Sequence, residues 1–111
     1  MSPEIEKKVL GLVGLGVRGR LAVIGVEQVR VAAQRGTLRC AVVATDASRH
    51  SQQKVRPMLE AKRIAVVEVP SASALGHAVG RETTAAVGIV DAPLARGIRA
   101  LARQGGSAHQ Q

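Results

Sequence analysis

Apolar residues recur along the chain with two spacings, which together predict alternating helices and strands. Ile5, Val9, Leu12 and Val13 lie three to four positions apart, so residues 4–17 are predicted to form an amphipathic helix. Residues 38–45 are almost all apolar without alternation, as expected for a central strand covered on both faces. The same reasoning predicts strands at 21–24, 66–69 and 85–90, and helices at 25–35, 49–61, 71–80 and from about 92 to 104.

Three of these strands are followed by a capping residue and then a helix. The junctions read Asp46-Ala47-Ser48, Pro70-Ser71-Ala72 and Asp91-Ala92-Pro93. Strands that alternate with helices of about ten residues predict an α/β protein, a three-layer α/β/α sandwich. We expect the loops after the strands to gather on one edge of the sheet, and we expect a kink or a restart at Pro57 in its helix.

The strand-to-helix junction at Val69-Pro70-Ser71 is the most informative of the three. Pro70 stops a β-branched run, and Ser71 or Ser73 can then cap a short helix that Gly80 ends. Open α/β sheets tend to bind ligands at such strand ends, where helix N-termini present unpaired N–H groups to anions. The junction is therefore a candidate ligand site.

The length of 111 residues predicts one domain, which we place at residues 1–104, followed by a disordered tail at 105–111 after Gly105 and Gly106 end the last helix. No apolar run reaches the roughly 18 residues that suggest a membrane span, and the N-terminus does not resemble a signal peptide. We therefore expect a cytoplasmic protein without a membrane partner. The single Cys40 lies within the central apolar run and is expected to be buried and inert.

The chain is strongly basic, with 16 Lys and Arg against 8 acids and a formal net charge of +8. Such an excess favours a polyanion through Coulomb attraction and counterion release, although a solvated arginine-rich surface would look the same. The absence of Phe, Tyr and Trp excludes base stacking on aromatic platforms. Any RNA binding must therefore use hydrogen bonds, arginine planes and shape.

Four arginines lie in sequence around the turn at residues 24–27, where the second helix begins: Arg18, Arg20, Arg30 and Arg35. They make this turn a candidate anion-binding helix N-terminus. A second stripe, Arg96, Arg99 and Arg103, is equally well explained by a solvated helix face.

Motifs for catalysis, cofactors and metals are weak. The glycines of residues 14–19 match the dinucleotide pattern G-x-G-x-x-G, but no helix follows them directly and no acid lies about 20 residues on. Asp46 and Asp91 have no second acid beside them and are better explained as helix caps than as metal ligands. The three histidines, His50, His77 and His109, lack metal-ligand spacing. We expect no catalytic residues, no metal and no small-molecule cofactor.

The order of several short motifs resembles the kink-turn RNA-binding superfamily of ribosomal proteins L-seven-Ae and L-thirty-e, especially its small bacterial YlxQ-like branch. The motifs that carry the resemblance, between residues 8 and 103, are Leu10-Gly11-Leu12, Gly25, residues 41–48, Lys54-Val55, Val69-Pro70-Ser71, Leu75-Gly76, Gly80-Arg81-Glu82 and residues 86–91. The resemblance implies an α/β/α sandwich around a mixed, about four-stranded sheet that binds structured RNA without chemistry.

The resemblance also implies a site in two zones. The first is the start of the second helix, which in the family contacts sheared G·A pairs; the second is the Val69-Pro70-Ser71 loop, which packs against a flipped-out base. The family pattern in the first zone is Gly-Thr-Asn-Glu, two residues and Lys, and of these only Gly25 is kept here. Glu27, Gln28 and Val31 stand in place of Asn, Glu and Lys, so the donors and the cation that read the G·A step are missing.

Our hypothesis from the sequence is a non-enzymatic protein that binds structured RNA, with ribosomal or ribonucleoprotein components as partners. The residues assigned to the RNA are Arg18, Arg20, Gly25, Glu27, Gln28, Arg30, Val69, Pro70 and Ser71. Two alternatives stay open. One is a protein-interaction module on the same fold with the RNA surface lost, and the other is a nucleotide-binding enzyme that depends on the glycine run alone.

Overall fold

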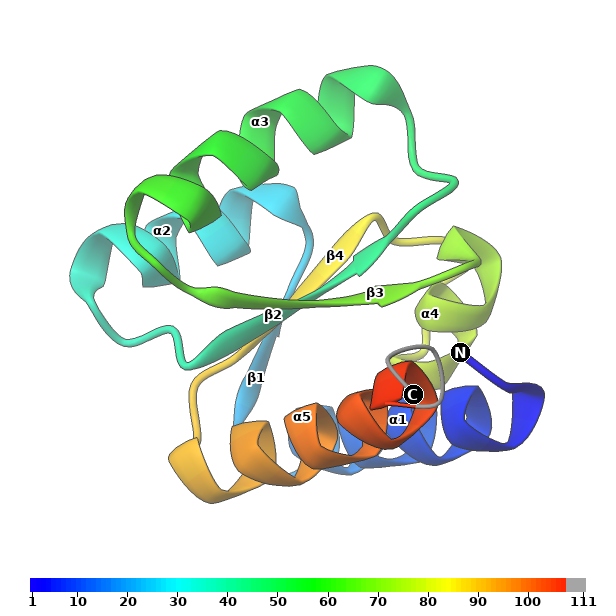
Figure 1. The fold of residues 1–111 in the computed structure, drawn as a ribbon. Helices are drawn as coiled ribbons and strands as arrows, with labels where there is room; N and C mark the ends of the chain where they lie inside the picture. The colour runs from blue at the N-terminus through cyan, green and yellow to red at the C-terminus, as the bar shows by residue number, and fades with distance from the viewer. Residues whose placement is uncertain (108–111) are drawn as a thin grey trace.

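The computed structural model describes residues 1–107 and contains five helices and four strands in the order that the sequence predicts (Figure 1). In chain order they are α1 (Pro3–Arg18), β1 (Ala22–Ile24), α2 (Val26–Arg35), β2 (Cys40–Ala44), α3 (Arg49–Ala61), β3 (Ala65–Val69), α4 (Ala72–Ala78), β4 (Ala86–Ile89) and α5 (Ala92–Ser107).

The strands form one mixed sheet in the order β1-β4-β2-β3. β2 pairs parallel with β3 and antiparallel with β4, and β4 pairs antiparallel with β1. β1, β2 and β3 therefore all run in one direction and β4 runs against them. We call the end of the sheet where β1, β2 and β3 finish its carboxyl end, and the end where they begin its amino end.

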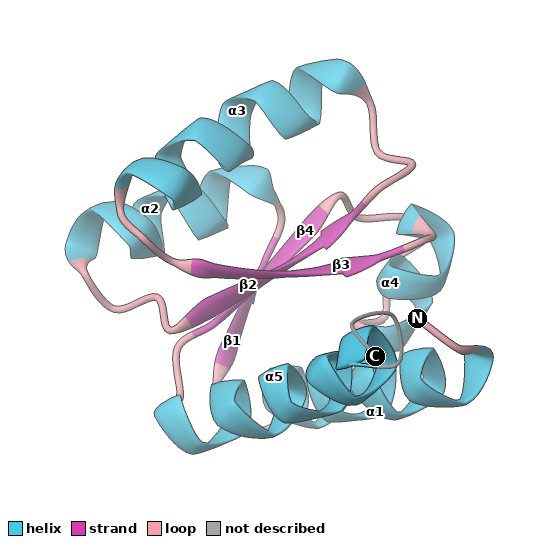
Figure 2. Cartoon of the chain, in the orientation of Figure 1, coloured by secondary structure: helices cyan, strands magenta, loops and turns pink. Residues whose placement is uncertain are grey.

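Helices cover both faces of the sheet, which confirms the predicted three layers (Figure 2). On one face, α2 and α3 bury an apolar cluster that includes Val29, Val43 and Leu59. On the other, α1, α4 and α5 bury a second cluster around Val42 and Ile98. All five residues of β2 are buried, because this strand lies between the two clusters. Burial of each such side chain contributes about 1.5–3 kcal/mol to folding.

Local signals in the sequence fix the helix ends. Ser48 Oγ accepts a hydrogen bond from Ser51 N at the start of α3, and Asp91 Oδ2 accepts one from Leu94 N at the start of α5. Gly36 ends α2 in the left-handed conformation, with φ 74°. Such caps satisfy backbone groups that the helix itself leaves unpaired.

The glycines of residues 14–19 lie in and just after α1 and not in a strand-to-helix loop, so they do not form a dinucleotide-binding turn. Gly14 packs against α4, where an added Cβ would lie 2.8 Å from the carbonyl oxygen of Ala78. Gly16 packs against α5, where a Cβ would lie 2.6 Å from Leu94 Cδ2. These glycines let three helices approach one another on the same face of the sheet.

Three expectations need correction. The helix α3 runs through Pro57 without a restart, and this proline lies on its exposed side. The last helix continues through Gly105 and Gly106 to Ser107, so its predicted end is too early; residues 108–111 of the predicted tail lie outside the described residues. The loops after the strands do not share one edge, because β4 runs opposite to β2 and β3. Asp91 therefore lies at the amino end of the sheet.

Candidate nucleic-acid interface

The carboxyl end of the sheet brings the two predicted zones together. Gly25 N donates to the carbonyl of Ala86 at 2.8 Å, Ala44 N donates to that of Ala85 at 2.9 Å, and Thr45 N donates to that of Val69 at 2.8 Å. These bonds join all four strands at this end, from the start of α2 to the loop before α4. With neighbouring strands about 4.8 Å apart, the two zones lie about 14 Å from each other.

Gly25 sets the backbone conformation at the start of the first zone. Its backbone, with φ 98° and ψ 156°, is in a region that is essentially restricted to glycine, although a Cβ there would meet nothing within 4 Å. No side chain caps α2 at this position. The amides of residues 26–28 therefore have no acceptor within the helix and are available to an anion or a base edge.

The side chains of the first zone are tied to α3. Lys54 Nζ lies 3.3 Å from Glu27 Oε1, and Arg30 Nη1 donates to the backbone carbonyl of Lys54 at 2.7 Å. Gln28 is exposed. Arg30 thus positions α3 beside α2, and Lys54 places a positive charge next to the helix start, where Val31 provides none. Sequence reasoning did not assign Lys54 to the site, since its approach depends on the packing of two helices.

Of the three residues of the second zone, one is buried in the core, one caps a helix and one is exposed. Val69 is 1% exposed and its side chain belongs to the apolar core, so this residue supports the loop from below. Ser71 Oγ accepts a hydrogen bond from Ala74 N at 3.0 Å and caps α4. Pro70 is exposed and offers the apolar surface of this loop.

Asp46 supports the second zone from the neighbouring strand. Its Oδ1 accepts a hydrogen bond from Ala72 N at 2.7 Å, 26 residues along the chain. Asp46 is therefore a cap, as predicted, but for α4 and not for the helix that follows it. Thr84 N donates to the Ala72 carbonyl at 3.1 Å, so the loop before β4 is joined to the same point.

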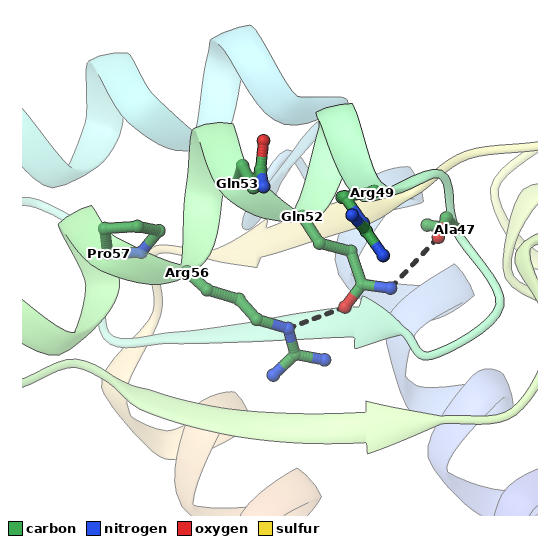
Figure 3. A pocket seen from close by; sticks show the side chains of 6 residues that line it. All are labelled: Ala47, Arg49, Gln52, Gln53, Arg56 and Pro57. Atoms are coloured by element: carbon green, nitrogen blue, oxygen red, sulfur yellow. Dashed lines mark hydrogen bonds between the residues drawn. The ribbon is translucent and has the colours of Figure 1, made fainter.

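A hollow of about 440 Å³ lies beside this end, on the outer side of α3 (Figure 3). Arg56 Nε donates to Gln52 Oε1 at 2.7 Å, and Arg56 Nη2 lies 2.9 Å from Glu68 Oε2 on β3. Gln52 Nε2 in turn donates to the carbonyls of Thr45 and Ala47, at 3.0 Å each. The lining residues are Ala47, Arg49, Gln52, Gln53, Arg56 and Pro57. These bonds hold the loop after β2 against α3.

Arg18 and Arg20 lie elsewhere. Both precede β1, whereas Gly25 follows it, so the whole of this strand separates them from the first zone. The structure therefore does not bring these two arginines together with the start of α2. Arg20 lies near the amino end of the sheet. Arg18, the last residue of α1, lines a hollow of about 380 Å³ between α1 and α4, together with Ala74 and His77.

Burial also affects the thiol of Cys40. Burial raises the pKa of the Cys40 thiol to about 11, and the positive charge of Arg99 opposes this shift only in part.

Residues 1–107 contain no cluster of three or more His, Cys, Asp or Glu that could hold a metal ion. None of the described helices is long and apolar enough to cross a membrane.

Comparisons with known proteins point to one family. The model of the "Ribosomal protein L7Ae/L30e/S12e/Gadd45 family" matches residues 7–96. A protein with unknown function from Bacillus halodurans superposes with a TM-score of 0.80 and 32% sequence identity, covering 86% of this chain and 97% of that one. The Giardia lamblia 15.5kD RNA binding protein has the same fold, with a TM-score of 0.75 and 22% identity over 91% of this chain and 92% of its own. None of the curated proteins compared matches the chain.

Proposed function

We propose that this chain, which belongs to the ribosomal protein L7Ae/L30e/S12e/Gadd45 family, is a non-enzymatic protein that binds structured RNA of the ribosome or another ribonucleoprotein. The observation that carries the proposal is the extent of the family match. Residues 7–96 include both the start of α2 and the Val69-Pro70-Ser71 loop, which the sheet brings to its carboxyl end. Membership of the bacterial YlxQ-like branch stays a prediction.

In this proposal the start of α2 reads the RNA. The amides of residues 26–28 and the exposed amide side chain of Gln28 bind base edges or a phosphate, while Lys54 offsets the charge of Glu27. Pro70 packs against an unstacked base, as its exposed ring allows. The RNA must therefore have an internal loop or bulge, because a regular A-form helix offers no splayed base to this surface.

The first zone lacks the side chains that read sheared G·A pairs in the family pattern. A glutamate and a glutamine occupy positions 27 and 28, and position 31 is valine. We propose that the chain distinguishes an internal loop from a duplex, with a weaker demand for the G·A pairs of a kink turn.

Binding of three labelled RNAs tests the proposal: a kink turn, an internal loop without G·A pairs, and a plain duplex, each titrated at two salt concentrations by fluorescence anisotropy. We expect both looped RNAs to bind more tightly than the duplex, with a gap that persists at the higher salt. The double variant Glu27→Ala, Gln28→Ala should lower the affinity for the looped RNAs about 10-fold and leave duplex binding unchanged.

Gln34→Ala is the matched control, since this glutamine is exposed on the same helix away from its start. It should leave all three affinities unchanged. Equal affinity for loop and duplex would contradict base recognition. An absence of binding to all three RNAs would overturn the proposal and favour a protein-interaction module on this fold.

A further inference from the structure

The amino end of the sheet carries a second group of basic residues, on the opposite side from the candidate interface. Ala22, Ile89, Cys40 and Ala65 lie side by side across the four strands. Arg39 immediately precedes β2, and Arg20 and Arg63 lie two residues before the first residues of β1 and β3, so their backbones lie close to this row. All three side chains are exposed. Three strand spacings of about 4.8 Å place them within one surface of about 15 Å.

The first turns of α5 extend this surface. The helix begins at the amino end, directly after β4, and exposes Arg96 and Arg99. A hollow of about 350 Å³ is lined by these two arginines together with Ala100 and Arg103. α5 packs against β3 and β4, and its Ala95 and Ile98 belong to the same apolar cluster as Cys40, the first residue of β2, so the start of this helix lies beside the same row.

Two of these arginines adopt a backbone conformation that is unfavourable for arginine. Arg20 has φ 62° and Arg63 has φ 57°, and they are the only residues other than glycine with positive φ between residues 1 and 107. A side chain with a Cβ costs free energy in this left-handed region, where glycine or asparagine is usual. Folding alone therefore does not favour arginine at either turn, yet two of the three helix-to-strand turns at the amino end carry it in this conformation, and the third has Gly36.

Few negative charges oppose this group. The two ion pairs of the described chain, Glu27–Lys54 and Arg56–Glu68, lie away from it. The carboxylate of Asp91 is used to cap α5, and Glu60 lies on the last turn of α3. The six basic residues Arg20, Arg39, Lys62, Arg63, Arg96 and Arg99 have no ion-pair partner among the described residues. We call these six the amino-end surface.

We propose that the amino-end surface binds the phosphate backbone of an RNA duplex, separate from the RNA at the carboxyl end. Five of its six residues are arginine, whose planar guanidinium matches phosphate oxygens in two-pronged contacts. The chain has no aromatic residue for stacking on bases, so this surface recognises charge and shape. A protein that binds at both ends of its sheet joins two RNA segments about 16 Å apart, the length of β2.

Glycine substitutions at Arg20 and Arg63 distinguish an effect on RNA binding from an effect on folding. The double variant Arg20→Gly, Arg63→Gly removes two charges and relieves both left-handed turns, so its melting temperature should stay the same or rise. Its affinity for a plain RNA duplex should fall at least 10-fold at low salt, and the slope of log K against log salt should become shallower by about two. The matched control, Lys7→Gln with Lys8→Gln, removes two exposed charges from α1 and should change the affinity less than threefold.

The joining of two RNAs is tested directly by capturing a labelled duplex on an immobilised looped RNA through the protein. Parent protein and the lysine control should capture the duplex, and the double glycine variant should not. Equal duplex affinity in parent and glycine variant would overturn the proposal, as would an equal loss in the lysine control. Loss of binding to phosphatidylserine vesicles with unchanged duplex binding would assign the surface to a membrane and also overturn it.

These outcomes are distinguishable from failure of the proposed function. If the preference for looped RNA is absent but duplex binding depends on Arg20 and Arg63, the carboxyl-end proposal fails and this one holds.

Discussion

Asp46 Oδ1 accepts a hydrogen bond at 2.7 Å from the backbone N–H of Ala72, so a carboxylate that follows β2 caps the helix that follows β3. The bond joins two loops that come from neighbouring parallel strands and leave the sheet in the same direction. It holds the start of α4, and with it Pro70, in place beside the end of β2. The second zone of the interface therefore depends on a residue outside the Val69-Pro70-Ser71 motif.

Removing this carboxylate should loosen the second zone. We expect Asp46→Ala to lower the free energy of unfolding by about 1 kcal/mol, the usual contribution of a cap, and to weaken binding of looped RNA. Ser48→Ala is the control, since Ser48 caps α3 in the same loop. It should cost a similar free energy of unfolding, measured by urea denaturation, without weakening RNA binding. Equal RNA affinities for parent and Asp46→Ala would contradict this role.

Gly76 is required by close packing between α4 and the loop before β4. A Cβ on this residue would lie 2.6 Å from Thr83 Cα and 2.8 Å from its backbone N and C. Because backbone must move, we expect Gly76→Ala to lower the free energy of unfolding by about 1–3 kcal/mol.

Gly11→Ala provides the comparison within α1, where nothing lies within 4 Å of an added Cβ. It should raise the free energy of unfolding by about 0.5–1 kcal/mol, because alanine favours a helix. Circular dichroism at the helix band follows both variants, since the chain lacks tryptophan and tyrosine. A loss in Gly11→Ala as large as in Gly76→Ala would show that the close packing is not the cause.

Gly25 and Gly36 flank the same helix and allow a matched test of the first zone. Gly25→Ala places a Cβ at φ 98° and ψ 156°, at an expected cost of about 1–3 kcal/mol, and should shift the start of α2. Gly36→Ala, at φ 74° and ψ 16°, should cost about 1 kcal/mol at the other end. Only Gly25→Ala should reduce the preference for looped RNA over duplex. A similar reduction in both variants would mean that lost stability, and not geometry, governs binding.

Cys40 should make stability depend on pH in alkaline solution. Its thiol has a pKa near 11 when folded, against 9.0 for the free group, so the folded state holds this proton more tightly than the unfolded state. The stabilisation is complete below about pH 9 and is lost as the pH rises towards 11, by about 2–3 kcal/mol in all. Urea denaturation at pH 8.5 and 10.5 should show a larger drop for the parent than for Cys40→Ala, and a thiol reagent should label the folded parent very slowly at pH 8.5. Equal drops in both proteins would contradict the raised pKa.

The sequence was sufficient for most of the elements and for the three layers, because those signals were local, whereas the mixed sheet was predicted only from the family resemblance. The unbroken apolar run before Thr45 marked a strand covered on both faces, and Gly36 and Ser48 marked helix ends. Whether two strands pair parallel or antiparallel has no such local signal in the sequence. Asp46 and Asp91 follow their strands in the same pattern, yet they lie at opposite ends of the sheet, since β4 runs against β2.

The site was less predictable for the same reason. Gly25 and Pro70 could be placed from motifs, whereas the bond from Asp46 to Ala72 and the approach of Lys54 to Glu27 join residues 26 and 27 positions apart. Arg18 and Arg20 are close to Gly25 in sequence, but an intervening strand carries them away from it. Residues that are close in sequence were therefore not close in space where a strand lay between them.

The ion pair between Arg56 and Glu68 has a consequence for the behaviour of the protein at high concentration. β3 is one of the two edge strands of the sheet, and its free side presents backbone groups that could pair with a second molecule. Glu68 puts a charge on that strand, and Arg56 holds it there at 2.9 Å. The strand is thereby protected against edge-to-edge aggregation, and Glu68→Val, which would leave a run of apolar residues from 64 to 69, should precipitate where the parent stays in solution.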